Sequence, residues 1–177
     1  MRKLGIIGVL SLLMLAFAAV PALAVAPTTV TSTGGLHVCQ GTTLDVEAVK
    51  TFDDFGNLQS VFLEGTGEVC GAGTGGTATL TADVEVVTGC INPGSKQHQP
   101  RGLQRTTTTT TGTAELEITR PGRGVFDVET TPVSTAGRTC PGQDIPVLVS
   151  ATFTNITLVI ESQTGTVTAT FPDIVDP

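Results

Sequence analysis

The stretch 77–86, TATLTADVEV, decides the fold class because it alternates alanine, leucine and valine with threonine and acidic residues throughout its length. Successive side chains of a strand point to opposite faces, so this pattern predicts a strand with one buried and one solvent-facing side. The same alternation recurs in segments 44–49, 114–119, 156–161 and 166–171. These segments therefore predict half-buried strands along most of the chain.

Turn-forming residues separate the alternating segments, at 53–57 (DDFGN), 120–124 (RPGRG) and 162–165 (SQTG). The chain contains 32 threonines, which favour strands, and it contains no convincing amphipathic helix. About eight short strands joined mostly by hairpins predict an all-β fold, an antiparallel two-sheet β-sandwich. A small β-barrel is the alternative, because the sequence does not reveal strand order or closure.

The N-terminus has the features of an export signal: Arg2 and Lys3, an apolar run over 4–20, and the small-residue cleavage pattern ending at Ala24. We expect residues 1–24 to be a signal peptide, 25–35 to be a flexible leader and 36–177 to form a single β-sandwich domain. No cysteine follows the cleavage site to accept a lipid, and no second apolar run approaches the ~20 residues of a membrane span. The mature chain is therefore expected to be secreted.

The chain is acidic, with nine basic and sixteen acidic residues and a net charge of −7. Loss of Arg2 and Lys3 leaves seven basic residues and a net charge of −9. Such a charge repels phosphate backbones, and no basic aromatic surface offsets it, so nucleic acid is not expected as a partner.

The segment 91–105 lacks alternation and is expected to be a long exposed loop. Its basic side chains form a candidate interaction loop that could meet the acidic strands of a second copy head to tail, or another extracellular surface component. A solvated loop without a partner is the alternative. The six threonines 106–111 favour an edge strand over a low-complexity linker. The interaction-loop residues are Lys96, His98, Arg101 and Arg105.

Four cysteines in an exported chain predict two disulfides, and three pairings are formally available. If segments 36–50 and 58–70 pair around the turn at 53–57, Cys39 lies opposite or nearly opposite Cys70. This predicts the pairs Cys39–Cys70 and Cys90–Cys140. A zinc site is disfavoured because the chain has no C-x-x-C spacing.

Acidic residues recur in pairs at i, i+2, which places both carboxylates of a pair on one face of a strand. If two such strands are neighbours, the carboxylates crowd together, and a weak surface calcium site is one outcome. A solvated outer face that discourages aggregation is the simpler interpretation. The residues concerned are Asp45, Glu47, Asp83, Glu85, Glu115, Glu117, Asp127 and Glu129.

A catalytic site is hard to assemble from this chain, which has two histidines, no G-x-S-x-G, no H-E-x-x-H and no expected free cysteine. We therefore predict no catalytic residues and no cofactor other than the calcium considered above. Threonine rows at 77–81 and 164–170 are one way to build an ice- or mineral-matching surface. No fixed-length repeat stacks them into an array, so ordinary outward-facing strand positions explain them.

The run Cys90-Ile91-Asn92-Pro93-Gly94, the downstream Cys140-Pro141 and the threonine-rich closing hairpins resemble small secreted bacterial Thr/Gly-rich β-sandwich proteins of uncharacterised function. The resemblance spans about 65–171. Prolines usually follow the loop motif in that group, whereas here a single proline, Pro100, follows it within the loop. The resemblance implies that the chain is exported and folds as a β-sandwich, and it does not imply any particular activity.

The combined pattern predicts a secreted, non-enzymatic structural or interaction module that binds or assembles at an extracellular surface or matrix. A calcium-stabilised extracellular binding protein is the first alternative, motivated by the paired acids. A hydrolase with an unrecognised carboxylate site is the second.

Overall fold

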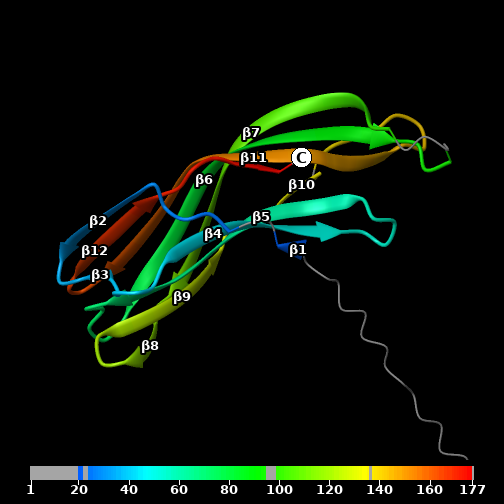
Figure 1. The fold of residues 1–177 in the computed structure, drawn as a ribbon. Helices are drawn as coiled ribbons and strands as arrows, with labels where there is room; N and C mark the ends of the chain where they lie inside the picture. Colours follow the sequence, from blue (N-terminus) through cyan, green and yellow to red (C-terminus); the bar gives the residue numbers. More distant parts are fainter. Residues whose placement is uncertain (1–19, 22–23, 95–98, 136, 177) are drawn as a thin grey trace, which may run out of the picture.

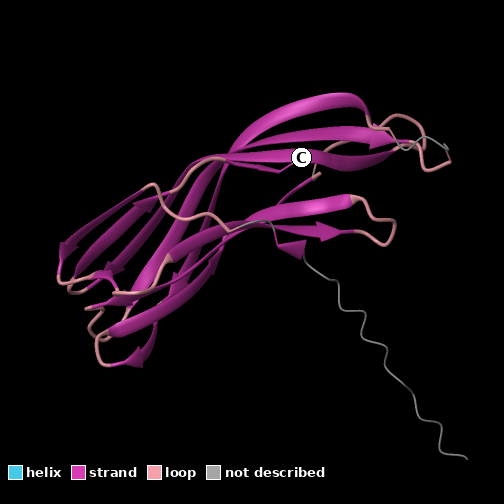
Figure 2. Cartoon of the chain, in the orientation of Figure 1, coloured by secondary structure: helices cyan, strands magenta, loops and turns pink. Residues whose placement is uncertain are grey.

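A computed structural model describes residues 20–21, 24–94, 99–135 and 137–176. Within these ranges every regular element is a strand, and none is a helix (Figure 2). No helix in the described part of the chain is long and apolar enough to cross a membrane. The strands form two antiparallel sheets that face each other, which confirms the predicted β-sandwich (Figure 1). The sheets stay separate and do not close into the alternative barrel.

The first sheet, called sheet A, has the strand order β1-β4-β5-β9-β8, and the short strands β3 and β10 also pair with β5. Its longest strand, β5, lies at the centre and is bordered by β4 on one side and β9 on the other. The bounds are β1 (Val20–Pro21), β3 (His37–Val38), β4 (Leu44–Phe52), β5 (Leu58–Cys70), β8 (Glu117–Arg120), β9 (Arg123–Glu129) and β10 (Val133–Ser134).

The second sheet, called sheet B, has the order β2-β12-β11-β6-β7, with β13 pairing with β11. Its three long strands continue past the part that packs on sheet A, so the two layers diverge toward one end of the molecule (Figure 1). The bounds are β2 (Thr29–Gly34), β6 (Gly76–Ile91), β7 (Arg101–Glu115), β11 (Ile145–Ser162), β12 (Gly165–Thr170) and β13 (Ile174–Asp176).

The core lies between the two sheets and is built by the alternate residues that the sequence pattern singled out. On β6 the side chains of Ala78, Leu80 and Val84 are fully buried, while Thr79 and Thr81 between them face outward. Leu158 and Phe153 of β11 and the inner residues of β4 and β5 complete the same cluster. Burial of each large aliphatic side chain stabilises the fold by roughly 1.5–3 kcal/mol.

The N-terminal part of the described chain differs from the expected flexible leader over 25–35. Residues 29–34 form β2, which pairs along its whole length with β12 at the edge of sheet B. Val25 also forms a bridge with Val46 of β4. Most of the expected signal peptide lies outside the described residues, but Val20 and Pro21 pair with β4 as β1. Cleavage after Ala24 would therefore leave β4 as an edge of sheet A.

The expected exposed loop over 91–105 is shorter in the structure. Ile91 still belongs to β6, and β7 already begins at Arg101, so residues 101–105 are strand and only 92–100 connect the two. The prediction failed here because this part of β7 is an edge strand with solvent on both faces and hence no alternation. The threonines 106–111 do form part of this edge strand, as predicted.

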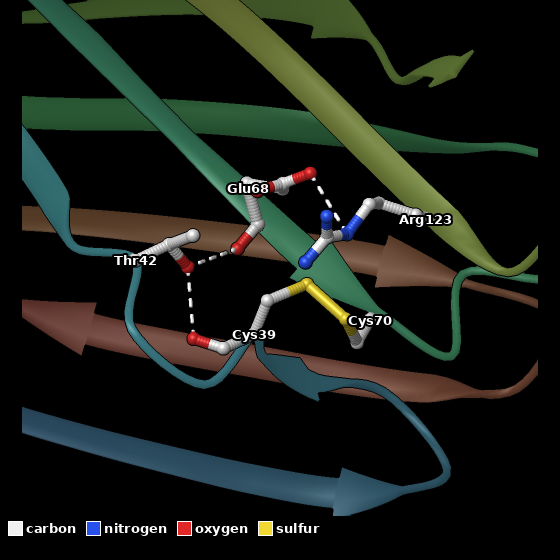
Figure 3. A network of polar contacts seen from close by, with 5 residues as sticks. All are labelled: Cys39, Thr42, Glu68, Cys70 and Arg123. Carbon is white, nitrogen blue, oxygen red and sulfur yellow. Dashed lines mark hydrogen bonds and ion pairs between the residues drawn. A yellow bond between two sulfur atoms is a disulfide. The ribbon is translucent and has the colours of Figure 1, made fainter. Parts of the chain in front are cut away.

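Both predicted disulfides, Cys39–Cys70 and Cys90–Cys140, are confirmed. The register behind the first is not one continuous hairpin, because β3 and β4 are separate and His37, not Cys39, pairs with Cys70. Thr42 stabilises the break: its hydroxyl lies 2.9 Å from the Cys39 carbonyl and 3.5 Å from that of Glu68 (Figure 3). Arg123 of β9 forms an ion pair with the Glu68 carboxylate at 2.9 Å, so three strands meet around this disulfide.

The two sheets are in direct backbone contact where β7 passes the end of β9. A Cβ atom on Gly112 would lie 1.8 Å from the carbonyl oxygen of Glu129, so no other residue fits at this position without moving the backbone. Beyond it, the Thr130 hydroxyl accepts a hydrogen bond from the Leu63 N–H at 3.0 Å in the interior. This bond links the end of β9 to β5 within sheet A, and the next residue joins the two layers, because the Thr131 N–H donates to the Thr111 carbonyl of β7 at 3.2 Å.

Candidate functional site

The outer face of sheet B carries a regular array of threonines, and we call it the threonine face. Strand registers align three rows across β2, β12, β11, β6 and β7, and threonine occupies every position except Val159, Glu161 and Glu115. The rows are Thr33-Thr166-Glu161-Thr77-Glu115, Thr31-Thr168-Val159-Thr79-Thr113 and Thr29-Thr170-Thr157-Thr81-Thr111.

The threonine face repeats in two directions. Neighbouring strands lie about 4.8 Å apart and alternate residues of a strand about 6.7 Å apart, so methyl and hydroxyl groups recur at these spacings. Two of the three rows carry no charge. Some hydroxyls bond across strands, including Thr29 to Thr170 at 2.6 Å and Thr81 to Thr111 at 3.4 Å. The pairing register of five strands thus aligns the threonines into an array, although the sequence contains no fixed-length repeat.

Charged groups border the threonine face where β6 continues past it. Asp83 accepts hydrogen bonds from the Asn155 amide at 3.0 Å and the Thr109 hydroxyl at 2.9 Å. These two bonds, that of Asn155 most strongly, hold the pKa of Asp83 below its ordinary value. Glu85 forms an ion pair with Arg105 of β7 at 2.6 Å. The acids of β6 therefore have partners on their own sheet.

The outer face of sheet A is acidic. Pairing of β4, β5 and β9 aligns Glu47, Glu64 and Glu129 in one row. The adjacent row contains Asp45 and Asp127 on either side of Thr66. We call these five carboxylates the acidic face.

Glu64 lies at the centre of the acidic face, where the neighbouring carboxylates disfavour its ionised form. Its partial burial raises its pKa, and the negative charges of Asp127, Glu47 and Glu129 raise it further. The i, i+2 pattern of paired acids does not include Glu64, because Glu64 is a single acid with no acidic partner at i+2. Its importance arises only from its position between two paired-acid strands.

The eight acids predicted from the i, i+2 pattern do not form one site. Asp45, Glu47, Asp127 and Glu129 share the acidic face, whereas Asp83 and Glu85 lie on sheet B. Glu115 and Glu117 lie where the chain passes from β7 to β8. Within the described residues no three His, Cys, Asp or Glu side chains are grouped so as to hold a metal ion. Calcium binding therefore stays a prediction that only titration can test.

The expected interaction loop is only partly described. Lys96 and His98 lie outside the described residues. Arg101 and Arg105 are exposed on β7, and Arg105 is already paired with Glu85. A basic residue that the sequence analysis did not single out, Arg138, lies beside them and bonds to the Gly102 carbonyl.

His37 is the histidine of the described chain, and its ring Nδ1 lies 3.0 Å from the Gly35 carbonyl, to which it donates. This contact is a local backbone bond between neighbours in sequence, and it directs the imidazole toward a turn rather than toward a carboxylate. His37 thus bonds to a backbone carbonyl and not to a serine or a carboxylate of the described residues.

Comparisons with protein-family models, with curated proteins and with solved structures found no match for this chain.

Proposed function

We propose that this protein is a secreted, non-enzymatic interaction module that binds an extended extracellular surface through its threonine face. The carrying observation is the alignment of threonines from five strands into uncharged rows. A broad face with short side chains suits contact with an extended surface rather than a small ligand. Export is supported by the N-terminal signal pattern and by two disulfides, which persist in oxidising compartments.

The contrast between the two outer faces supports the same proposal. The acidic face gathers five carboxylates, and it keeps the protein soluble and repels anionic surfaces. The threonine face offers methyl and hydroxyl groups without charge in two rows, so its contacts do not require ion pairing. A partner is therefore oriented toward sheet B and away from sheet A.

Co-sedimentation with insoluble extracellular polymers tests the proposal, with purified cell-wall polysaccharide and microcrystalline cellulose as probes. Thr79 lies within an uncharged row, so Thr79→Lys places a charge in the middle of the threonine face. Thr66→Lys is the matched control, because it adds the same charge between Asp45 and Asp127 on the acidic face. We expect Thr79→Lys to abolish sedimentation with the polymer and Thr66→Lys to preserve it. Equal loss in both variants, or hydrolysis of the polymer by the unmodified protein, contradicts the proposal.

Self-assembly is a second candidate function, favoured by the edge strand β7. Residues 101–109 of β7 are exposed and β6 covers only one of its sides. Exposed edge strands are templates for pairing with another chain. Sheet B has its other edge at β2, so pairing of β7 with β2 of a second copy would extend the sheet from copy to copy.

A further inference from the structure

A groove of about 350 Å³ lies on the inner side of β7, where the two sheets diverge. Gln104, Thr106 and Thr108 of β7 form one wall, and residues 132–135 with Gly137 and Arg138 form the other. Val86 and Thr88 of β6, both buried, form its floor. This volume is within the range of small-ligand sites. The groove lies on the opposite side of sheet B from the threonine face.

Arg138 is held in one position at this groove. Its Nη1 donates to the Gln104 side-chain oxygen at 2.5 Å and its Nη2 to the Gly102 carbonyl at 2.5 Å. Its Nε is buried and has no hydrogen-bond partner in the described structure. Two residues further along the chain, Cys140 forms the disulfide with Cys90 of β6, which anchors this segment to sheet B. The guanidinium is thus oriented before any ligand arrives.

The charge of Arg138 is not neutralised. Both of its protein partners are uncharged oxygens, and no carboxylate of the described residues lies within ion-pair distance of it. The groove lining likewise contains no acid. Buried donors without partners are rare, and a charged one costs more than a neutral one. An anionic ligand would compensate this positive charge.

The other residues that line the groove indicate which chemical groups the ligand has besides its negative charge. The hydroxyls of Thr88, Thr106, Thr108 and Thr135 surround the groove. Guanidinium groups favour planar carboxylates, to which they donate parallel hydrogen bonds. Hydroxyl side chains can donate to and accept from the hydroxyl groups of a sugar.

We propose that this groove binds a carboxylated sugar, with the carboxylate against the guanidinium of Arg138, whose charge has no counter-ion among the described residues, and the sugar hydroxyls on the threonines. This is a second site, independent of the proposed function of the threonine face. Titration of the mature, disulfide-bonded protein with sodium glucuronate, followed by amide NMR shifts, tests it. We expect shifts at Gln104, Thr106 and Arg138, with a dissociation constant on the order of 1 mM that rises with ionic strength.

Two pairs of variants locate the site. Arg138→Gln should weaken glucuronate binding at least about tenfold, whereas Arg101→Gln, which removes a charge from the same region of β7, should not. Thr108→Phe places a ring in the groove while Arg138 itself is not replaced. Thr107→Phe places the same ring on the opposite face of the strand. Thr108→Phe should block binding and Thr107→Phe should preserve it, and amide spectra show whether each variant is folded.

Glucose and sodium acetate are the control ligands. The proposal requires glucuronate to bind more tightly than either, because both the carboxylate and the hydroxyls contribute. Equal shifts with glucose or with acetate overturn it, as does the absence of shifts with glucuronate at tens of millimolar. Sedimentation with polymers through the threonine face is unaffected by these outcomes, so failure of one proposal is distinguishable from failure of the other.

Discussion

Asn155 Nδ2 donates to Asp83 Oδ2 across 3.0 Å and ties a bulge in β11 to β6. The strand register shifts between Thr154 and Thr157, and Asn155 within the bulge has a φ of 52°, a left-handed conformation. Asparagine tolerates this conformation better than most residues with a side chain. One residue thus provides both the backbone geometry and the side-chain bond that the bulge requires.

Substitution of Asn155 separates these two roles. Asn155→Ala should be less stable than Asn155→Gly by roughly 1 kcal/mol in urea denaturation, because only alanine carries left-handed strain. Both variants lose the bond to Asp83, which holds the pKa of Asp83 below its ordinary value. The stabilisation from this bond is therefore present above the ordinary aspartate pKa and is lost as pH falls through the lower folded value. The advantage of wild type over Asn155→Gly should therefore shrink in acid. Equal stability of the two variants would refute the strain argument.

Neutralising Glu64 should stabilise the protein at neutral pH. Its pKa is raised in the folded state, so the ionised carboxylate destabilises the fold, and this effect disappears as pH falls and Glu64 becomes protonated. Glu64→Gln should raise the melting temperature at pH 7 and match wild type below the ordinary glutamate pKa. Glu117→Gln is the control, since Glu117 is exposed at the end of the sheet. A Glu64→Gln variant less stable than wild type at pH 7 contradicts the repulsion argument.

The acidic face also predicts how salt affects stability. Added sodium chloride should raise the melting temperature by screening repulsion among these carboxylates. We expect calcium to give the same rise at equal ionic strength, and a chelator to have no effect. A larger rise in calcium that Glu47→Gln and Glu129→Gln abolish would instead establish the calcium-stabilised alternative.

Each disulfide should contribute roughly 4 kcal/mol to stability, because the bridges close loops of 31 and 50 residues in the unfolded chain. Replacement of either pair by alanine should lower the urea midpoint to a similar degree. Only the loss of Cys90–Cys140 should also weaken glucuronate binding, because that bridge anchors the segment carrying Arg138. Equal effects of both replacements on binding would show that the anchor is not specific.

Proline in β7 tests self-assembly through its edge. The Thr111 carbonyl accepts a hydrogen bond from Thr131 on the side away from β6, and the register between Thr107 and Thr111 is continuous, so the backbone groups of Thr107 and Thr109 also point away from β6. Thr107→Pro therefore removes an N–H from the free edge and leaves the β6–β7 ladder intact. Light scattering should show concentration-dependent association of the wild-type protein and less of the variant. A monomer at every concentration excludes assembly by this edge.

The alternating segments predicted the core strands well, because burial on one face imposes a period of two. The segment 77–86 is part of β6, an inner strand of sheet B between β11 and β7. The cysteine pairing followed from the turn at 53–57 even though the break at Thr42 displaced the register. Strands without a buried face gave no such signal. Residues 29–34 are exposed throughout and become a strand only by pairing with β12, far away in sequence.

The candidate sites depended on contacts that a single sequence does not display. Glu64 matters because β4 and β9 flank it, and the threonine face exists because separate strands align. Arg138 had no motif around it, and its lack of a counter-ion is visible only once Gln104 and Gly102 are placed beside it. Each of these features arises from registers between distant strands.

Gly112 has a consequence for how the threonine tract can change over generations. The six identical residues 106–111 cannot by themselves define the register between β7 and β6. A shift of β7 by two residues would leave each threonine on the same face of the sheet. Gly112 prevents this shift, since only a residue without Cβ fits beneath the Glu129 carbonyl. If threonine codons are gained or lost in the tract, the residues before it should therefore shift, toward the connection over 92–100. The residues of β7 that follow Gly112 should keep their alignment with β6.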